Sequence, residues 1–383
     1  MSNATYSPGL EGVIAGETAI CTVEGGLSYR GYFVGDLAEN CTFDEVAYLL
    51  LHGELPSAAE LKAFQDRVAA ARRIPPPFRD LLAALPKWTT PLDALRTVVS
   101  GLAHFDPDVN DNSHDANLRK AERLLAQIPV AIADQFALSR GNTPIAARQD
   151  LGHSANFLYM LRGTEPGPEE VKAMDVSLIL YAEHEFNAST FAARVIVSTL
   201  SDLHAGITGA IGALKGPLHG GANEKVVDIL TAAGGTPESA EVWIRAALAR
   251  KERIMGFGHR VYKAGDVRAG ILKKYARDMA EAQSPPVATG GLAPLTQLED
   301  TADTIERIMA SEKNMYPNLD WPAGRLYHAM KLEIPLYTPI FAMSRITGWS
   351  AHIIEQLDNN RLIRPRGLYK GPGPRAVKAL AAR

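Results

Sequence analysis

Cysteine is scarce in this 383-residue chain, which contains only Cys21 and Cys41. Two thiols cannot build a disulfide framework or a zinc site with four cysteine ligands, so we interpret both as inert side chains. Long apolar runs are also missing, and no stretch approaches the ~20 residues that a helix needs to cross a bilayer. The N-terminus lacks a basic segment followed by an apolar run, which predicts a cytoplasmic protein without a secretory signal.

A strong net charge of either sign is lacking as well. The formal net charge is −3, so no overall field favours nucleic acid or an anionic membrane, and we expect neither as a partner. The chain has 46% hydrophobic and 22% charged residues, which is typical of a soluble globular protein. A chain of this length is long enough for two domains with their own cores.

The spacing of apolar residues predicts a mostly helical protein. Only the start differs, because residues 18–23 and 27–34 flank the loop Glu24-Gly25-Gly26 in the pattern of a β-hairpin. Residues 284–295 and the tail after Pro365 are rich in proline and glycine, so we expect a surface loop and a tail that wraps a surface. The predicted helices are 43–52, 58–73, 78–85, 91–104, 116–139, 153–162, 169–183, 189–214, 223–230, 237–251, 269–281, 301–313, 326–330, 339–347 and 350–358.

Small residues recur at helical spacing within residues 189–214, Gly206 and Gly209 among them. Small side chains let another helix approach closely, so this segment is predicted to lie at a crowded core or subunit contact. A nucleotide-binding loop is disfavoured, since no strand precedes the segment and its spacing is not G-x-G-x-x-G.

One acidic stretch resembles a calcium-binding loop. Asp106, Asp108 and Asn110 match the first three ligand positions of an EF-hand. The sixth position, however, is Asp111 rather than glycine, and the twelfth is Asn117 rather than glutamate. We therefore predict a solvated loop between two helices and no metal site.

Four polar segments in the second half of the chain are candidates for chemistry, and two of them centre on a histidine. His184 lies between Glu183 and Glu185, an arrangement that can hold an imidazole charged, although such a residue is more often a satisfied polar group. His219, within residues 216–224, precedes a predicted helix. Because a helix N-terminus disfavours imidazolium, we expect His219 to be neutral and able to donate a hydrogen bond.

The other two segments carry cations and a carboxylate. Gly256 and Gly258 precede His259 among basic residues. This pattern suits a loop that closes over a phosphorylated anionic ligand, with a solvated basic face as an equal alternative. Asp320 lies between a proline and a Trp-Pro turn, where a carboxylate can be partly desolvated and made basic; an ordinary Asx turn is the alternative.

Taken together, these segments resemble the citrate synthase family. The stretches G-P-L-H-G-G-A-N-E at 216–224, M-G-F-G-H-R-V-Y-K at 255–263 and Y-P-N-L-D at 316–320 are similar, in order, to its three catalytic segments. The resemblance runs from G-L-E-G-V-I-A-G-E-T at 9–18 to I-R-P-R at 363–366, which is nearly the whole chain.

The resemblance implies an all-α, two-domain helical fold with a short N-terminal β-hairpin. A large domain would comprise residues 1–219 and 327–383, and a small domain would comprise residues 220–326. It also implies a homodimer, with an active site in the cleft that closes when oxaloacetate binds.

The implied activity is that of a Si-type citrate synthase of the tricarboxylic acid cycle. Such an acyltransferase condenses acetyl-CoA with oxaloacetate and hydrolyses the thioester to citrate and CoA. By resemblance, Asp320 removes a methyl proton from acetyl-CoA, and His219 stabilises the enolate by donating to the thioester oxygen. His259 would polarise and protonate the oxaloacetate carbonyl.

The resemblance also implies the binding residues. Those for oxaloacetate are His184, Arg268, Arg345 and, supplied by the partner subunit, Arg364. Those of the coenzyme A loop are Glu252, Arg253, Ile254, Met255 and Gly256. A small dicarboxylate needs several fixed cations, and a guanidinium can bind each carboxylate with two hydrogen bonds. No metal and no tightly bound cofactor are implied, because the coenzyme A thioester is a co-substrate.

Three alternative functions remain open. A 2-methylcitrate synthase would use propionyl-CoA through the same residues, and one methylene is worth only ~1–3 kcal/mol in a pocket. The stretch after Asp320 reads Trp321-Pro322 where the family usually has an aromatic pair, so the acyl preference stays undecided. A silent acyl-CoA-binding paralogue would bind without condensation, and a metal-dependent hydrolase would need His184, His219 and His259 on one ion.

Overall fold

The protein is built almost entirely of helices. The structure, a computed structural model, describes residues 6–259, 262, 265–282 and 294–382. The α-helices are α1 (Val34–Asn40), α2 (Phe43–His52), α3 (Ala58–Ala70), α4 (Pro76–Ala84), α5 (Pro91–Leu102), α6 (His114–Ser139), α7 (His153–Arg162), α8 (Pro168–Tyr181), α9 (Ala188–Val197), α10 (Leu203–Leu214), α11 (Glu224–Ala232), α12 (Pro237–Ala249), α13 (Val267–Ala282), α14 (Leu295–Lys313), α15 (Asp320–Ala329) and α16 (Tyr337–Asp358). Short 3-10 turns are η1 (Pro8–Leu10), η2 (Ala103–Phe105), η3 (Gly220–Ala222), η4 (Ile334–Leu336) and η5 (Leu380–Ala382).

A small antiparallel sheet precedes the helices, with strands β1 (Cys21–Thr22), β2 (Ser28–Tyr29) and β3 (Tyr32–Phe33) in that order. The predicted hairpin is therefore present, with Cys21 opposite Tyr29. Its second arm is shorter than predicted. Arg30 and Gly31 have positive φ angles of 48° and 89°, so the chain turns there and starts a third strand.

Capping side chains explain where several helices begin. The predicted capping box at α2 is confirmed: the Thr42 side chain accepts from the Glu45 amide, and the Glu45 carboxylate accepts from the Thr42 amide at 2.7 Å. Ser57 and Glu60 form the same arrangement at α3. These local hydrogen bonds satisfy amide groups that the helix itself leaves unpaired.

Two of the helix predictions were wrong about continuity. The segment 189–214 is two helices, because Leu200 adopts a positive φ of 69° and Asp202 caps α10 by accepting from Ala205. Conversely, 339–347 and 350–358 are one helix, α16, which continues through Gly348. Gly348 is the point of closest approach to residues 182–183, whose atoms would collide with any Cβ there.

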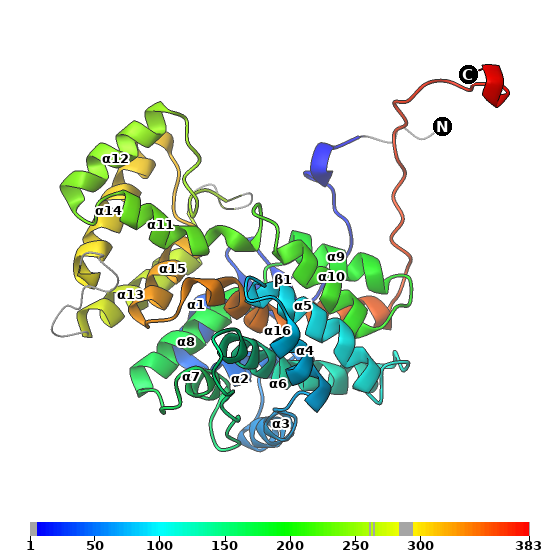
Figure 1. Cartoon of the computed structure of the whole chain (residues 1–383), viewed down its shortest axis with the longest axis horizontal. Coiled ribbons are helices and arrows are strands. Elements are labelled where there is room, and N and C mark those ends of the chain that lie inside the picture. The colour runs from blue at the N-terminus through cyan, green and yellow to red at the C-terminus, as the bar shows by residue number, and fades with distance from the viewer. Residues whose placement is uncertain (1–5, 260–261, 263–264, 283–293, 383) are drawn as a thin grey trace.

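Helix α16 forms the centre of the core and is buried from Tyr337 to Ile354. Helices α2, α6, α8, α9 and α10 pack around it (Figure 1). The small residues of α10 serve the close packing that the sequence predicted, because a Cβ on Gly206 would lie 2.8 Å from side-chain atoms of both Ile353 and Val197. A central helix buried on all sides can place side chains with little freedom.

Helices α11 to α15 pack mainly against one another and lie together on one side of the molecule (Figure 1). Helix α13 also contacts α8 and α1 on the other side. This group covers much of the small domain predicted at residues 220–326, and the boundary itself stays a prediction.

Both ends of the chain leave the body on the same side (Figure 1). The tail from residue 364 to residue 381 is exposed and forms no core element, as predicted. That it wraps a surface stays a prediction. Of the predicted loop at 284–295, residues 284–293 lie outside the described residues. None of the described helices is both long and apolar enough to span a membrane.

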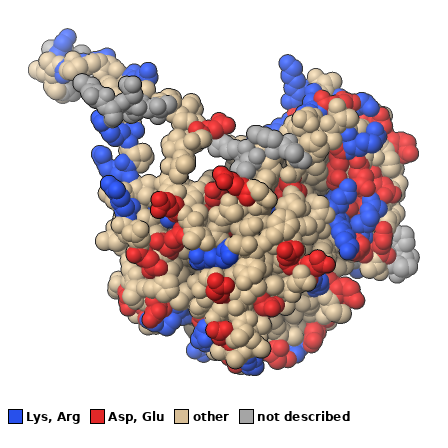
Figure 2. All heavy atoms as spheres, turned by 180° about the vertical axis from the view of Figure 1, so that it is seen from behind, with Lys and Arg blue, Asp and Glu red and all other residues tan. Residues whose placement is uncertain are grey.

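Charged side chains of both signs are interspersed over the body of the molecule on the face that Figure 2 shows, whereas the charged residues of the projecting C-terminal tail are lysines and arginines. Two carboxylates of the acidic stretch at 106–111, those of Asp106 and Asp108, pair with arginines. Arg123 donates to both carboxylate oxygens of Asp106, and Arg119 does the same to Asp108. Their pairing with guanidinium groups gives these carboxylates a structural role.

Candidate active site

A cavity of about 650 Å³ gathers side chains from segments that are far apart in the sequence. It lies between the α16 side of the molecule and the group of helices α11 to α15. The predicted site residues that line it are His184, His219, Arg253, Ile254, Met255, Gly256, His259, Arg268, Asp320 and Arg345. Of the predicted set, only Glu252 and Arg364 lie elsewhere.

Asp320 stands at the first turn of α15, where its amide donates to the Asn318 side chain at 3.1 Å. The helix therefore begins six residues before the predicted start at Leu326. One carboxylate oxygen, Oδ1, accepts a hydrogen bond from the Tyr181 hydroxyl at 2.7 Å. Burial raises the pKa of Asp320 to about 6, against the opposing effects of that hydrogen bond and of nearby Arg268. The predicted partly desolvated and basic carboxylate is thus present.

His219 is neutral at physiological pH, as predicted, but for a different reason. Burial, together with the positive charge of Arg345, lowers its pKa to about 4. Its Nε2 lies 2.8 Å from the Ser189 hydroxyl, which Trp349 also contacts through its indole N–H at 3.0 Å. The single Ser189 hydroxyl proton can go to Nε2 or to Oδ1 of Asn187, which also lies 2.8 Å from the hydroxyl. When it goes to Nε2, the neutral ring carries its proton on Nδ1 and can donate it to a ligand.

His184 and His259 face each other with ring centroids 5.0 Å apart. Tyr262 connects them, because its hydroxyl lies 3.0 Å from Nε2 of His184 and its amide donates to Nδ1 of His259 at 3.3 Å. A neutral His259 ring with Nδ1 as acceptor carries its proton on Nε2. Nε2 is then a donor, and His259 lines the cavity.

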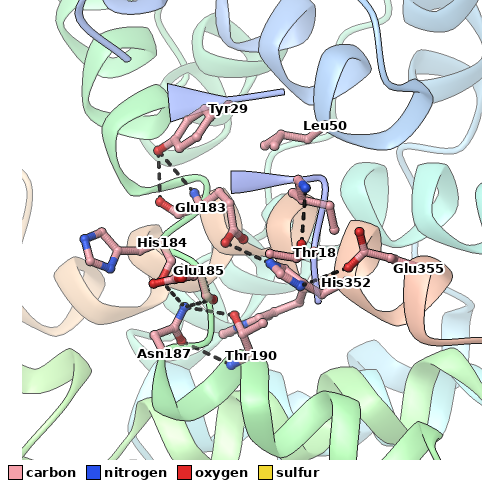
Figure 3. A network of polar contacts seen from close by, with 12 residues as sticks. Thr18, Tyr29, Leu50, Glu183, His184, Glu185, Asn187, Thr190, His352 and Glu355 are labelled. Carbon is pink, nitrogen blue, oxygen red and sulfur yellow. Dashed lines mark hydrogen bonds and ion pairs between the residues drawn. The ribbon is translucent and has the colours of Figure 1, made fainter. Parts of the chain in front are cut away.

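Of the two interpretations of His184, the satisfied polar group fits the structure and the charged imidazole does not, because Nε2 lies 3.0 Å from the Tyr262 hydroxyl. Burial lowers the pKa of His184 well below the ordinary value, and Arg268 adds to this effect. The Glu183 carboxylate does not act on His184 but accepts a hydrogen bond from Nε2 of His352 at 2.9 Å (Figure 3). Sequence neighbours at the end of α8 thus point in different directions.

The two predicted substrate arginines that line the cavity have opposite environments. Arg268 donates two hydrogen bonds to Asp266, at 3.0 and 2.7 Å. Burial lowers the pKa of Arg268, but this pairing outweighs it and the net change is upward. Arg345 donates from Nε to the Tyr181 carbonyl at 2.6 Å, while its buried Nη1 has no partner within the described part of the chain. Arg345 is thus the less compensated cation beside the cavity.

One face of α16 supports the site from behind. We call Phe341, Arg345, Trp349 and His352 the α16 stripe, because their spacing places them on one side of the helix. Phe341 packs on the Tyr181 ring with centroids 4.3 Å apart. Trp349 bonds Ser189 and His352 bonds Glu183, so each member positions a residue in or next to the cavity.

The stripe continues into a buried polar network (Figure 3). Arg194 donates to Nδ1 of His352 at 2.9 Å and to Glu355 at 2.7 Å. Glu355 in turn accepts from the amide of Ala19 in the N-terminal arm at 2.8 Å. Since Arg194 occupies Nδ1 as a donor, Nε2 of His352 carries the proton that Glu183 accepts.

Sequence reasoning missed Tyr181, Ser189, Phe341 and Trp349. Arg345 and His352, which are seven positions or about two turns apart, were a usable signal for the α16 stripe, because buried polar groups need partners. Tyr181 gave no such signal, since it ends an apolar run and its partner lies 139 positions away.

The predicted coenzyme A loop is only partly in the cavity. Arg253 to Gly256 line it, whereas the Glu252 carboxylate accepts from Arg250 at 2.7 Å on the surface and lines an adjoining cavity of about 440 Å³. Gly256 has a φ of 86° and lies against buried Trp321, to which a Cβ would approach within 3.0 Å. Trp321 therefore supports the loop from behind, and its indole does not line the cavity.

Arg364 lies on the exposed C-terminal tail and does not line the cavity of its own chain. Its role across a subunit interface stays a prediction. Among the described residues no cluster of histidine, cysteine and acidic side chains is arranged to hold a metal ion.

Comparison with known proteins gives a consistent result. The family model described as "Citrate synthase, C-terminal domain" matches residues 9–366. Citrate synthase 2 from Bacillus subtilis is 45% identical over 96% of both chains. A 2-methylcitrate synthase from Mycobacterium tuberculosis strain H37Rv is 46% identical over 96% of this chain and 91% of that protein.

Solved structures are also similar. The crystal structure of citrate synthase from Pyrobaculum aerophilum has a TM-score of 0.88 and 39% identity, and covers 98% of this chain and 95% of that one. The ternary complex of citrate synthase from Thermoplasma acidophilum with carboxymethyl coenzyme A and oxaloacetate has a TM-score of 0.91 and 32% identity. That match covers 99% of this chain and all of the other.

Proposed function

The chain belongs to the citrate synthase family of acyltransferases, and from this premise we propose that it condenses acetyl-CoA with oxaloacetate to give citrate and CoA. The observation that carries this proposal is that Asp320, His219 and His259 line one cavity. A carboxylate with a raised pKa beside two imidazoles able to donate is what enolate formation and carbon–carbon bond formation require.

The first step is removal of a methyl proton from acetyl-CoA. Asp320 is the base, and its raised pKa brings its basicity closer to that needed at neutral pH. As the enolate forms, His219 donates from Nδ1 to the thioester oxygen. A neutral imidazole suits this role, because the charge that it stabilises appears only during the step.

The second step is attack of the enol carbon on the keto carbon of oxaloacetate. His259 donates its Nε2 proton to the keto oxygen, which becomes the hydroxyl of the product. Water then hydrolyses the thioester and releases CoA. Closure of the helices α11 to α15, proposed as the small domain, over the cavity would exclude bulk water until the new bond has formed.

Cations beside the cavity bind the two carboxylates of oxaloacetate. We assign Arg345, which lines the cavity, to one of them, because its buried Nη1 has no partner among the described residues. Arg268 contributes through its remaining N–H groups while Asp266 fixes its plane. We assign His184 to the keto acid as a neutral donor. Arg364 of a second subunit would complete the site in a homodimer.

The coenzyme A moiety lies along residues 253–256 and extends into the adjoining cavity. Lys251, Arg253 and Lys313 line that cavity and provide positive charge for the phosphates. The backbone of the loop supports the thioester end, where Gly256 packs closely on Trp321 behind the loop.

A 2-methylcitrate synthase is the second candidate, because relatives of both names have similar identities of 45% and 46%. The test is release of CoA from acetyl-CoA and from propionyl-CoA by the purified protein, with and without oxaloacetate. A higher kcat/KM for acetyl-CoA supports the first assignment and a higher value for propionyl-CoA supports the second. If neither thioester releases CoA in an oxaloacetate-dependent way, the proposed function is wrong.

A further inference from the structure

The Tyr181 hydroxyl makes the shortest hydrogen bond to Asp320, at 2.7 Å to Oδ1. Tyr181 ends α8, and its side chain is 2% exposed. The ring cannot move easily, because it packs on Phe341 with centroids 4.3 Å apart. Burial raises the pKa of Tyr181 well above its ordinary value, so the hydroxyl stays protonated and remains a donor.

The two oxygens of the Asp320 carboxylate are therefore not equivalent. Oδ1 is engaged by a fixed donor, while Oδ2 has no hydrogen-bond partner in the described parts of the chain, and Asp320 lines the cavity. The Asp320 backbone is fixed too, since its amide donates to Asn318. A carboxylate held at its backbone and at one oxygen presents the other oxygen in a single direction.

We propose that Tyr181 is the positioning residue of the catalytic base, holding Oδ1 of Asp320 so that Oδ2 is the oxygen that removes the substrate proton. This inference rests on the role of Asp320 in the proposed function. Tyr181 itself transfers no proton. It stabilises the ionised carboxylate before the reaction and remains bonded to it afterwards.

Other groups also act on this carboxylate, and the test has to separate them from Tyr181. The charged or titratable groups around it are Arg268 and Asp266 at the start of α13, Arg345 on α16, Tyr327 on its own helix, and the cavity histidines. Both arginines lower the pKa of Asp320 and Asp266 raises it. None of these groups donates a hydrogen bond to Oδ1 in the described structure.

The first variant is Tyr181→Phe, which keeps the ring on Phe341 and removes only the donor. Loss of a hydrogen bond to a charged group raises the pKa of that group, here Asp320, by about one unit or more. The acidic limb of the pH profile of kcat/KM should therefore move to higher pH by about one unit. The turnover should fall while the KM for oxaloacetate stays the same. With methyl-deuterated acetyl-CoA the isotope effect on kcat should rise, because proton removal becomes slower relative to later steps.

The second variant replaces Tyr181 with 3-fluorotyrosine, which changes little of the shape and makes the hydroxyl a stronger donor. The acidic limb should then move in the opposite direction, to lower pH. The 3-fluorotyrosine variant keeps the proposal testable even if Tyr181→Phe does not fold.

The matched control is Tyr327→Phe. Tyr327 is fully buried in the same helix as Asp320, but its hydroxyl bonds Ser177 at 2.6 Å. Its removal should leave the acidic limb and the isotope effect where they are. The proposal is overturned if both Tyr181 variants keep the wild-type limb and isotope effect, or if Tyr327→Phe shifts them equally. A wild-type protein without condensation activity would instead contradict the proposed function.

Discussion

The two sides of the cavity are built in different ways. On one side, the α16 stripe projects from a single buried helix, and its members gain partners from α8 and α9. The other side consists of loops and helix starts, at residues 253–259, 266–268 and 318–320. We call this side the turn wall. Arg345 on the helix side has an unpartnered Nη1 in the described structure, whereas Arg268 on the turn wall is paired with Asp266.

This difference indicates that the two sides of the cavity have different roles. Arg345 has no carboxylate in hydrogen-bond contact among the described residues, and the packing of the long buried helix and its bond to the Tyr181 carbonyl fix its position. A turn has fewer packing contacts, so its cation is fixed by a local carboxylate. We infer that the α16 side dominates attraction of the dicarboxylate, and that the turn wall supplies the base and the acid of the reaction.

The sharpest test of these roles is Asp320→Asn, which removes the base from the turn wall. General-base catalysis contributes about 10²–10⁴-fold, so we expect kcat to fall by about 10³-fold. Asparagine can still accept the bond from Tyr181, and the Kd for oxaloacetate measured by calorimetry should stay within about threefold. A near-normal turnover would contradict the assignment of the base.

Arg345→Gln should weaken oxaloacetate binding by about 100-fold, because a charge-assisted bond to a carboxylate is lost. The matched change on the turn wall is the double variant Asp266→Asn with Arg268→Gln, which removes the pair without leaving one charge buried. It should cost only about 10-fold, since the pair is already partly neutralised. Equal losses in a calorimetric titration would remove the distinction between the two sides.

Arg364→Ala should raise the Kd for oxaloacetate by about 10-fold if the second subunit adds a cation. Mixing Arg364→Ala subunits with Asp320→Asn subunits sharpens the test. One site of each hybrid dimer then has an intact Asp320 and receives an intact Arg364. Activity should recover on subunit exchange. No recovery would mean that Arg364 does not act across an interface.

Ser189→Ala tests the support that the α16 stripe gives to His219. Without the hydroxyl, Nε2 loses its partner and the tautomer with Nδ1 protonated is less favoured. We expect kcat to fall by about 10-fold, with the KM for oxaloacetate unchanged. The control Thr190→Val removes a hydroxyl that bonds Asn187 at 2.9 Å but does not contact His219. A larger effect of the control than of Ser189→Ala would contradict this support.

The smallest expected effect is on stability. The pKa of Asp320 rises from 3.8 to about 6 on folding, so its ionised form destabilises the folded protein. Asp320→Asn should therefore increase the free energy of unfolding at neutral pH by about 1–2 kcal/mol. The gain should shrink as the pH falls through about 6 and disappear below about 4, where both states hold the proton. Thermal unfolding across this range measures it.

Local signals predicted much of the fold. Thr42 with Glu45 marked the start of α2, and the small residues of α10 marked a close helix contact. The break at Leu200 was missed because the apolar spacing continues through it, and only the positive φ and the Asp202 cap separate the two helices. The two interpretations of His184 stayed open at the level of the sequence, because the sequence shows which carboxylates are adjacent but not where they point.

The sequence by itself determined the helical class of the protein, most of its helix positions, and the residues able to do chemistry, because these depend on spacing and side-chain type within a few neighbouring positions. Only the tertiary structure decided three contacts. Glu183 accepts a hydrogen bond from His352, Asp266 pairs with Arg268, and the Tyr181 hydroxyl donates to Asp320. These partners are either far apart in the chain or free to turn elsewhere, and burial changes the pKa of a group only once its surroundings are folded around it.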